Sequence, residues 1–371
     1  MNLDFSDEQT LLRETVRSLC ADLLDSQQLR ALERDEGGYS RRVWHALGET
    51  GVTGVLVSES HGGVGLGLID CAIVHEELGR CLAPVPHIPS CVLAARLIAL
   101  AGSDAQRHGW LPAIAAGERI VVPAWQEPGN SADIERVALA ARHAHGRIVL
   151  AGAKTLVPFA NSADALLVIA RLDGELVALL VPTHSAGINL VDLPNHAGQK
   201  LMRVDFAEVA VDAQNLFDGA PLAEAWQRAM HETLVALAAE SIGGAARMLE
   251  MATAYAKERV QFGQPIGAFQ AIAHYLADAA TEIEGVRWLV YQAAWAADTG
   301  RPFEQLALMA KLQAGAVFRR ATQKGVQIHG GLGFSLDADP QLFYRRAKHQ
   351  QLMYWDRAYL ERRIAAGVFG A

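Results

Sequence analysis

Two short glycine-containing segments stand out in the second half of the chain. The first reads Arg259-Val260-Gln261-Phe262-Gly263-Gln264-Pro265-Ile266-Gly267-Ala268-Phe269-Gln270 and follows a long stretch of helical character. The second reads Gln327-Ile328-His329-Gly330-Gly331-Leu332-Gly333. An arginine at a helix end can neutralise a pyrophosphate, and a glycine pair lets backbone amides approach phosphate oxygens closely. Together the two segments indicate a site for a phosphate-containing cofactor.

The composition of the chain excludes several classes of protein. Its 371 residues are too many for one ordinary core and predict two or three domains. A formal net charge of −8 offers no basic stripe for nucleic acid and no polybasic membrane anchor. We find no signal-peptide pattern and no window of about 20 uncharged apolar residues. We therefore expect a cytoplasmic protein that has neither nucleic-acid nor membrane partners.

The cysteines and histidines do not suggest a metal site. The cysteines are Cys20, Cys71, Cys81 and Cys91. They lack metal-ligand spacing and a secretory context, so we interpret them as reduced structural thiols. The 13 histidines show no ligand spacing either, and His75 is interpreted as a loop or core residue. We predict no bound metal.

The periodicity of apolar residues changes twice along the chain. Helical spacing starts after Ser6, the expected N-cap of a first helix, and continues to about residue 116. It is followed by short β-branched and aliphatic runs separated by turn residues, at 147–150, 165–170 and 176–181. Helical spacing returns after Pro221. The order of elements is therefore predicted to be helical, then β, then helical.

This order and the two glycine-containing segments resemble the acyl-CoA dehydrogenase family, over nearly the whole chain. The resemblance implies an α+β multidomain fold with three parts. These are an N-terminal α-helical domain at 1–118, a middle β-barrel-like domain at 119–218 and a C-terminal four-helix bundle at 219–371. It also implies FAD as the cofactor, bound across a dimer boundary.

The resemblance assigns the flavin contacts residue by residue. Arg259 and Gln261 would contact the pyrophosphate, and Phe262 would pack near the adenosine half of FAD. A guanidinium offers paired donors to phosphate, and a carboxamide donates without adding charge. The other expected contacts are Phe269 and Gln270, which would line the same groove, and Gln327, Gly330 and Gly331, which would close it from the neighbouring subunit. Alternatively, Arg259 only balances a helix dipole, which leaves the second segment unexplained.

Two segments of the β domain match the family less closely. Gln126 lies in a Trp-Gln-Glu-Pro-Gly run, where the family has a Thr-Glu-Pro-Gly loop against the flavin ring, and it is a further expected cofactor contact. Pro158 stands where the family has a threonine that supports the flavin N5 edge. Proline has neither a hydroxyl nor an N–H group to donate there. Whether this chain holds FAD on its own is left open.

The reaction of the family needs a carboxylate base that removes the α-proton of the acyl group. Most members carry it in a Glu-Gly-Thr run, and Tyr354 occupies that position here. A phenol with an ordinary pKa of about 10 is a poor base at neutral pH. Other members place the glutamate on the first bundle helix, at the position of Thr233. Glu232 precedes that position, but a one-residue offset rotates it by about 100° around the helix.

Glu240 is the candidate base that we select. It lies seven residues beyond Thr233, which returns it to roughly the same helix face. Its apolar and small neighbours in sequence would raise a carboxyl pKa and leave room for a ligand. The alternative interpretation is that Glu240 pairs with an arginine at a subunit boundary.

The function implied by the resemblance is FAD-dependent dehydrogenation of an acyl-CoA thioester to a trans-2-enoyl-CoA, with electrons passing to an electron-transferring flavoprotein. The sequence around Glu240 resembles members that act on bulky acids, including steroid side chains, so we expect a branched or bulky acyl group. Several such members pair unlike subunits, so a homo- or hetero-oligomer, dimer or tetramer, is expected.

Two other functions stay open. The chain could be a non-catalytic partner subunit of a heteromeric acyl-CoA dehydrogenase, or a flavin oxidase or monooxygenase on the same fold. The base could then be Glu232 or lie on a partner chain.

Overall fold

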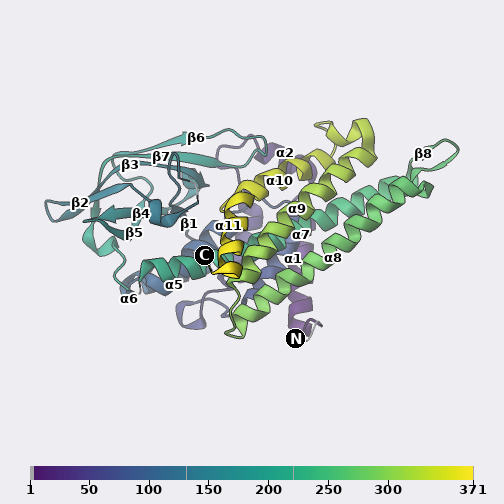
Figure 1. The fold of residues 1–371 in the computed structure, drawn as a ribbon. Coiled ribbons are helices and arrows are strands. Elements are labelled where there is room, and N and C mark those ends of the chain that lie inside the picture. The colour runs from purple at the N-terminus through teal and green to yellow at the C-terminus, as the bar shows by residue number, and fades with distance from the viewer. Residues whose placement is uncertain (1–3, 131, 220, 371) are drawn as a thin grey trace. The chain divides into compact units, whose positions relative to one another are not determined.

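The computed structural model describes residues 4–130, 132–219 and 221–370 (Figure 1). The chain divides into two compact units. One contains the N-terminal segment up to Leu29, Leu68–Ala83 and everything from Leu234 onward, and the other contains Arg30–Gly67 and Pro84–Thr233. We describe each unit by itself. The three-domain division at residues 118 and 218 stays a prediction.

Helices dominate the two ends of the chain, as predicted. They are α1 (Asp7–Leu23), α2 (Ser26–Leu32), α3 (Arg41–Glu49), α4 (Leu68–Arg80), α5 (Ala95–Ala101), α6 (Asp104–Ala115), α7 (Leu222–Glu258), α8 (Gln270–Asp298), α9 (Glu304–His329), α10 (Pro340–Leu352) and α11 (Arg357–Phe369). Ser6 caps α1 as expected, because its side chain accepts from the backbone N–H of Gln9. No helix within the described residues combines the length and the apolar character that a membrane span requires.

The middle of the chain forms a curled sheet, so the predicted α+β fold is confirmed (Figure 1). Its strands are β1 (Val121–Ala124), β2 (Ala140–Ala144), β3 (Arg147–Pro158), β4 (Ala165–Leu172), β5 (Glu175–Pro182), β6 (Ile188–Asp192) and β7 (Leu201–Asp212). The apolar strand β4 pairs in parallel with β1 and antiparallel with β5. A buried strand of this kind needs no alternation of polar residues, because both of its faces are covered.

Helices α4 and α7 cross with their backbones in close contact. A Cβ atom added at Gly243 of α7 would lie 1.8 Å from the carbonyl oxygen of Glu76 in α4. A Cβ atom added at Gly79 would lie 2.0 Å from the carbonyl oxygen of Glu240. No side chain fits at such distances, so glycine is required at both positions.

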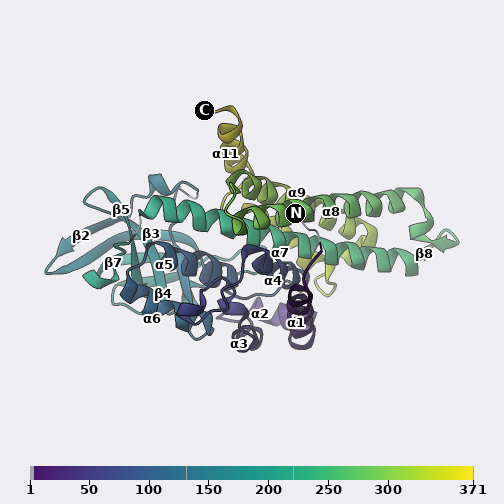
Figure 2. The ribbon, with the colours of Figure 1, turned by 90° about the horizontal axis from the view of Figure 1, so that it is seen from below.

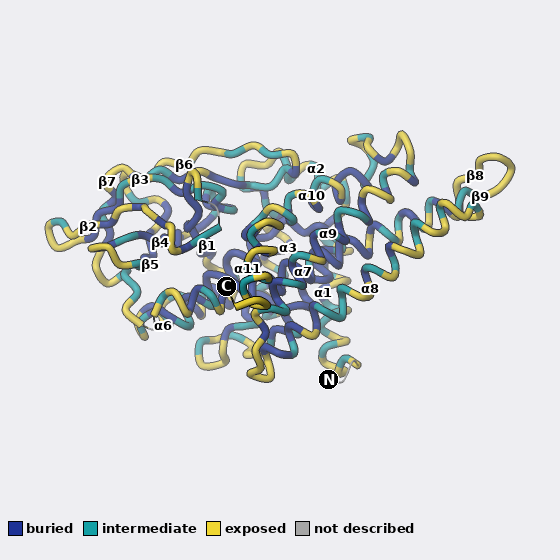
Figure 3. The backbone as a smooth tube through the Cα atoms, viewed as in Figure 1, coloured by how far each residue is buried: buried dark blue, intermediate teal, exposed yellow. Residues whose placement is uncertain are grey.

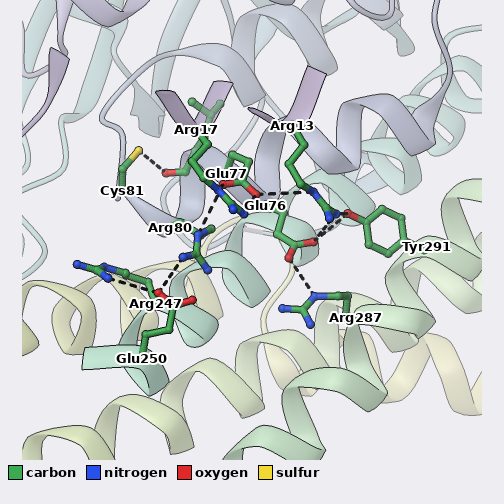
Figure 4. Close-up of polar contacts among 11 residues, drawn as sticks. Arg13, Arg17, Glu76, Glu77, Arg80, Cys81, Arg247, Glu250, Arg287 and Tyr291 are labelled. Atoms are coloured by element: carbon green, nitrogen blue, oxygen red, sulfur yellow. Dashed lines mark hydrogen bonds and ion pairs between the residues drawn. The ribbon is translucent and has the colours of Figure 1, made fainter. Parts of the chain in front are cut away.

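The same crossing buries two adjacent carboxylates, Glu76 and Glu77, which are 6% and 2% exposed. Figure 4 shows how each is compensated. Glu76 accepts from Arg287 Nε at 2.9 Å and from the hydroxyl of Tyr291 at 2.8 Å. Glu77 accepts two hydrogen bonds from Arg17, at 2.8 and 2.7 Å. Buried charges of this kind require such partners, and the network therefore ties α1, α4 and α8 together.

The close approach at Gly243 predicts a stability effect. Gly243→Ala should destabilise the protein by about 2 kcal/mol or more, because the added methyl group forces α4 and α7 apart. Thermal unfolding of the purified protein measures this as a fall in Tm. The matched control is Gly285→Ala, since Gly285 is an exposed helical glycine with nothing within 4 Å of its added Cβ. The free energy of unfolding of that control should rise by about 0.5–1 kcal/mol. An unchanged Tm for Gly243→Ala would contradict the predicted close packing.

Candidate active site

The segment from Arg259 to Phe269 leaves α7 and enters α8 through a hairpin of two short strands, β8 (Val260–Gln261) and β9 (Gln264–Pro265). The hairpin is exposed throughout (Figure 3). At its tip Phe262 is 93% exposed and meets Phe269 edge to face, with 6.1 Å between ring centroids. Arg259 is exposed too, and within the described residues its guanidinium has no ion-pair partner.

The second predicted segment lies at the end of α9. Figure 2 shows α8 running beside α9, with the β8 hairpin where α8 begins. Ile328 packs in one cluster with Ala256 and Ile266, and the ring of His329 stacks on that of Tyr255 at 4.6 Å. Because these contacts join the two segments, the structure brings them to the same end of one unit. The assignment of either segment to the flavin of a neighbouring subunit stays a prediction.

The geometry of this end suits a phosphate-bearing cofactor. A Cβ atom added at Gly330 or Gly331 would meet nothing within 4 Å, so the backbone there is open to an approaching ligand. Gly330 also has a φ of +61°, which glycine adopts without strain. The N–H of Gly330 itself donates to the carbonyl of Gln327, so the exposed guanidinium of Arg259 is the main group here that can bind a pyrophosphate. Gln327 and Gln270 are exposed at the same end and add carboxamide groups.

Gln126 belongs to the other unit, where it is buried. Its backbone carbonyl accepts from the N–H of Thr155 in β3 at 2.9 Å. Beside it, Lys154 Nζ lies 2.6 Å from Glu127 Oε1 in a buried ion pair. Burial lowers the pKa of Lys154 to about 8, although Glu127 acts in the opposite direction. The loop that carries Gln126 is thus fixed to β3. Pro158, the last residue of β3, has no N–H to donate, as the sequence indicated.

Glu240 lies on α7 at its crossing with α4, and its side chain keeps 15% exposure. Gln350 of α10 donates from Nε2 to Glu240 Oε1 at 2.5 Å. The hydroxyl of Ser241 donates to Gln350 Oε1 at 2.8 Å, which fixes the orientation of that amide. Nδ1 of the buried His75 lies 3.5 Å from Glu240 Oε2. Within the described residues no arginine of the same chain contacts Glu240. The alternative interpretation, an arginine at a subunit boundary, stays a prediction.

Tyr354 lies close to Glu240. Burial first, and then the negative charge of Glu240, raise the pKa of Tyr354 well above its usual value. Its ring is 7% exposed, and its φ of +60° is uncommon for a residue other than glycine. A phenol held neutral in this way cannot act as a base at neutral pH. Glu240 therefore acts electrostatically on Tyr354, whose equivalence to the usual base position of the family stays a prediction.

Lys311 of α9 holds the turn that carries Tyr354. Its Nζ donates to the carbonyls of Gln350, Gln351 and Trp355 at 2.9, 3.3 and 3.4 Å. The side chain is only 1% exposed, and burial lowers the pKa of Lys311 to about 7. One ammonium group therefore fixes the end of α10 and the chain that follows it.

Glu232 is engaged in ion pairs. Arg96 donates to both of its carboxylate oxygens, at 2.6 and 3.0 Å, and Arg228 donates to Oε1 at 3.1 Å. The hydroxyl of Thr233 donates to the carbonyl of Ala229 one turn back. A carboxylate held by two guanidinium groups is a weak proton acceptor, so these contacts argue against Glu232 as the base.

Sequence reasoning missed two of the residues that surround Glu240. His75 was taken as a loop or core residue; it is buried in the core, yet it faces the carboxylate. Gln350 is separated from Glu240 by 110 residues and carries no motif of its own. Only the packing of α4 and α10 against α7 places these side chains together. Within the described residues no cluster of three or more metal-ligating side chains occurs.

Comparison with known proteins agrees with this fold. The model of the acyl-CoA dehydrogenase N-terminal domain matches residues 6–118, and that of the C-terminal domain matches residues 223–368. Acyl-CoA dehydrogenase IpdE2 of Mycobacterium tuberculosis is 31% identical over 359 residues, which cover 96% of either chain. Benzylmalonyl-CoA dehydrogenase of Aromatoleum aromaticum is 30% identical over 357 residues, which cover 93% of either chain.

A solved structure of the ChsE4-ChsE5 complex from Mycobacterium tuberculosis contains a similar chain. It superposes with a TM-score of 0.91 at 26% identity, and the match covers 100% of both chains. The protein therefore belongs to the acyl-CoA dehydrogenase family, whose members are flavin-dependent oxidoreductases.

The depressed pKa of Lys311 predicts a pH dependence of stability. Between its folded pKa of about 7 and its unfolded pKa of about 10.4, the unfolded chain binds more protons than the folded one. The free energy of unfolding that Lys311 contributes should therefore rise with pH across this window, by up to about 1.4 kcal/mol per pH unit. Urea unfolding of the wild type and of Lys311→Met, at about pH 7 and about pH 9, measures it.

The comparison with Lys311→Met isolates the contribution of this one group, since the variant keeps the length of the side chain but cannot titrate. The unfolding free energy of the wild type minus that of the variant should be larger at the higher pH. A difference that is constant with pH would show that Lys311 keeps an ordinary pKa in the folded protein.

Proposed function

We propose that this protein is an FAD-dependent acyl-CoA dehydrogenase in which Glu240 is the base that removes the α-proton of the acyl thioester. The observation that supports this most is that Gln350 and His75 hold a partly exposed carboxylate in one orientation. The carboxylate is partly exposed, and its Oε1 atom is fixed by Gln350. A positioned carboxylate that reaches the reacting region is what proton abstraction from an acyl-CoA requires.

The neighbours of Glu240 suit this role. Gln350 donates to Oε1 of Glu240 and so holds the carboxylate in place, while Oε2 faces His75. Tyr354 stays neutral and adds no second negative charge beside it. FAD, when bound, would accept the hydride that leaves the β-carbon, and the electrons would then pass to an electron-transferring flavoprotein. The product of these two events is a trans-2-enoyl-CoA.

We assign the FAD contacts to the exposed end of α8 and α9. The pyrophosphate would be bound by the guanidinium of Arg259 and by the open backbone at Gly330 and Gly331. Phe262 would pack on the adenosine half, which accounts for an aromatic ring that is 93% exposed in the single chain. The supporting residues in this proposal are Gln261, Phe269, Gln270 and Gln327, with Gln126 at the flavin ring.

The acyl group of the substrate is proposed to be branched or bulky. The name of benzylmalonyl-CoA dehydrogenase, a relative of similar length, refers to a thioester whose acyl group bears a ring. In this chain the residues of α7 that precede Glu240, from 234 to 239, are all small or aliphatic, so none of them would select a charged acyl chain.

A second candidate function is that of a non-catalytic subunit in a heteromeric acyl-CoA dehydrogenase. Two observations favour it. Tyr354 replaces the usual base, and Pro158 cannot make the hydrogen bond that the threonine of other members makes to the flavin. The similar chain of the ChsE4-ChsE5 structure belongs to a complex of two named proteins. A chain of this kind, purified alone, should hold little flavin and be poorly stable.

The substitution Glu240→Gln tests the leading proposal. The purified wild type should carry the absorbance of oxidised flavin, and anaerobic addition of branched, ring-bearing or steroid-type acyl-CoA thioesters should bleach it. Loss of the base should slow this bleaching by a factor on the order of 10²–10⁴, because an amide cannot accept the α-proton. Stopped-flow absorbance measures the rate.

The control is Glu232→Gln, which alters a carboxylate that is already held by Arg96 and Arg228. This variant should bleach at nearly the wild-type rate as long as it folds. Bleaching that survives in Glu240→Gln would eliminate Glu240 as the base. A colourless wild type would favour the partner-subunit candidate, and co-expression with the neighbouring gene product should then restore flavin.

A further inference from the structure

A cavity of about 310 Å³ opens among α1, α4, α7 and α10 in the unit that contains Glu240, and no step of the proposed reaction uses it. Two of the four cysteines, Cys20 and Cys81, line this cavity. Three arginines line it as well, namely Arg17, Arg80 and Arg247. The chain thus places two thiols from distant parts of the sequence at one partly open cavity.

The two thiols differ in their surroundings. Cys20 lies in the last turn of α1 and is 2% exposed, whereas Cys81 is half-buried in the turn that follows α4. The thiol of Cys81 donates to the carbonyl of Leu78 at 3.3 Å (Figure 4). A hydrogen bond between the Cys81 and Cys20 thiols, and then burial, raise the pKa of Cys20 above its ordinary value. Arg17 and Glu77, which stand three and four residues before these cysteines on α1 and α4, are hydrogen-bonded to each other, so the two cysteines follow side by side. Cys81 is the more exposed of the two.

Exposure decides which of the two thiols meets an oxidant first. The three arginines that line the cavity are balanced by Asp25, Glu77 and Asp339, which line it as well. Charge therefore does not distinguish the two thiols. The half-buried Cys81 is the one that an oxidant can reach, and a thiol attacks as its thiolate.

We propose that Cys20 and Cys81 form an oxidation site, which closes to an intrachain disulfide when the protein meets hydrogen peroxide. The Cys81 thiolate attacks one oxygen of the peroxide, and the O–O bond breaks. Hydroxide is the leaving group, and Cys81 becomes a sulfenic acid. The sulfur of Cys20 then attacks that of Cys81, and the S–S bond forms as water leaves. In total two thiols are oxidised, one peroxide is reduced and two waters are produced.

The local structure permits the S–S bond to form. Cys81 lies one residue beyond Arg80, the last residue of α4, so its backbone is not held by the helical hydrogen bonds on both sides. Leu82 follows with a φ of +52°, which marks a sharp turn. A small shift of this turn brings the two sulfur atoms from hydrogen-bond contact to bonding distance, whereas a pair held inside two rigid helices would resist it.

The remaining cysteines lack these features. Cys71 is 0% exposed and Cys91 is 1% exposed, so neither offers an oxidant a path to the sulfur. Burial raises the pKa of Cys91 above its usual range, which further disfavours its thiolate. The proposed reaction is therefore specific to one pair of the four thiols.

The disulfide would join α1 to the end of α4, beside the ion pair of Arg17 with Glu77. Helix α4 also carries His75, which faces Glu240. A cross-link at this point fixes α4 relative to α1 without removing any residue of the proposed active site. The inference stands on the cavity and its two thiols alone, and it holds for a catalytic chain or a partner subunit.

Peptide mapping of the purified full-length protein tests the proposal. The protein is treated with hydrogen peroxide, its remaining thiols are alkylated under denaturing conditions, and a digest without reductant is analysed by mass spectrometry. We expect two of the four thiols to be no longer available for alkylation. We also expect one disulfide-linked peptide pair, Cys20 with Cys81, which a reductant separates again. The linked pair should appear in monomeric chains on a non-reducing gel.

Variants distinguish the disulfide between Cys20 and Cys81 from other oxidation products. Cys20→Ser should abolish the linked pair and leave Cys81 to oxidise further, whereas Cys71→Ala, the control on the same helix α4, should leave the linkage intact. Three results would overturn the proposal: four alkylated thiols after treatment, a link between two chains, or oxidation of Cys81 in the wild type without any link. The mapping is made on the wild type, so poor folding of a variant cannot decide it.

Discussion

The packing of the unit that contains Glu240 depends on one contact, the close crossing of α4 with α7. Glycines at 79 and 243 let the two backbones touch, and no other residue would fit there. Close contact brings the side chains that flank the glycines into the interior. Glu76 and Glu77 must then find partners, and Arg17, Arg287 and Tyr291 supply them from α1 and α8. His75 reaches Glu240 across the same crossing.

Local signals in the sequence were sufficient for the order and type of the elements. Ser6 and Gln9 form a capping box at the expected start of α1, and the β-branched runs at 147–150 and 165–170 lie in β3 and β4. These features depend on residues that are close in sequence, since caps and strand propensities act over a few positions. The two glycine-containing segments were found in the same way, and the structure joins them through Ile328.

The surroundings of the candidate base could not be predicted in this way. Gln350 and His75 come from helices far from Glu240 in sequence, and neither residue type signals such a role by itself. The same holds for Lys311, an ammonium group enclosed by the carbonyls at the end of α10. A lysine in a helical pattern is ordinarily taken to be at the surface, and only tertiary packing reveals its burial. Sequence reasoning selected Glu240 as the candidate base, but nothing in the sequence pointed to the amide and the imidazole that face it.

The proximity of Tyr354 to Glu240 limits how the chain could change. The charge of Glu240 already disfavours an ionised group at position 354. A glutamate introduced there would meet both the same burial and the same negative charge, and each disfavours a second ionised carboxylate. The neutral phenol at position 354 therefore lets the chain keep a charged group at position 240.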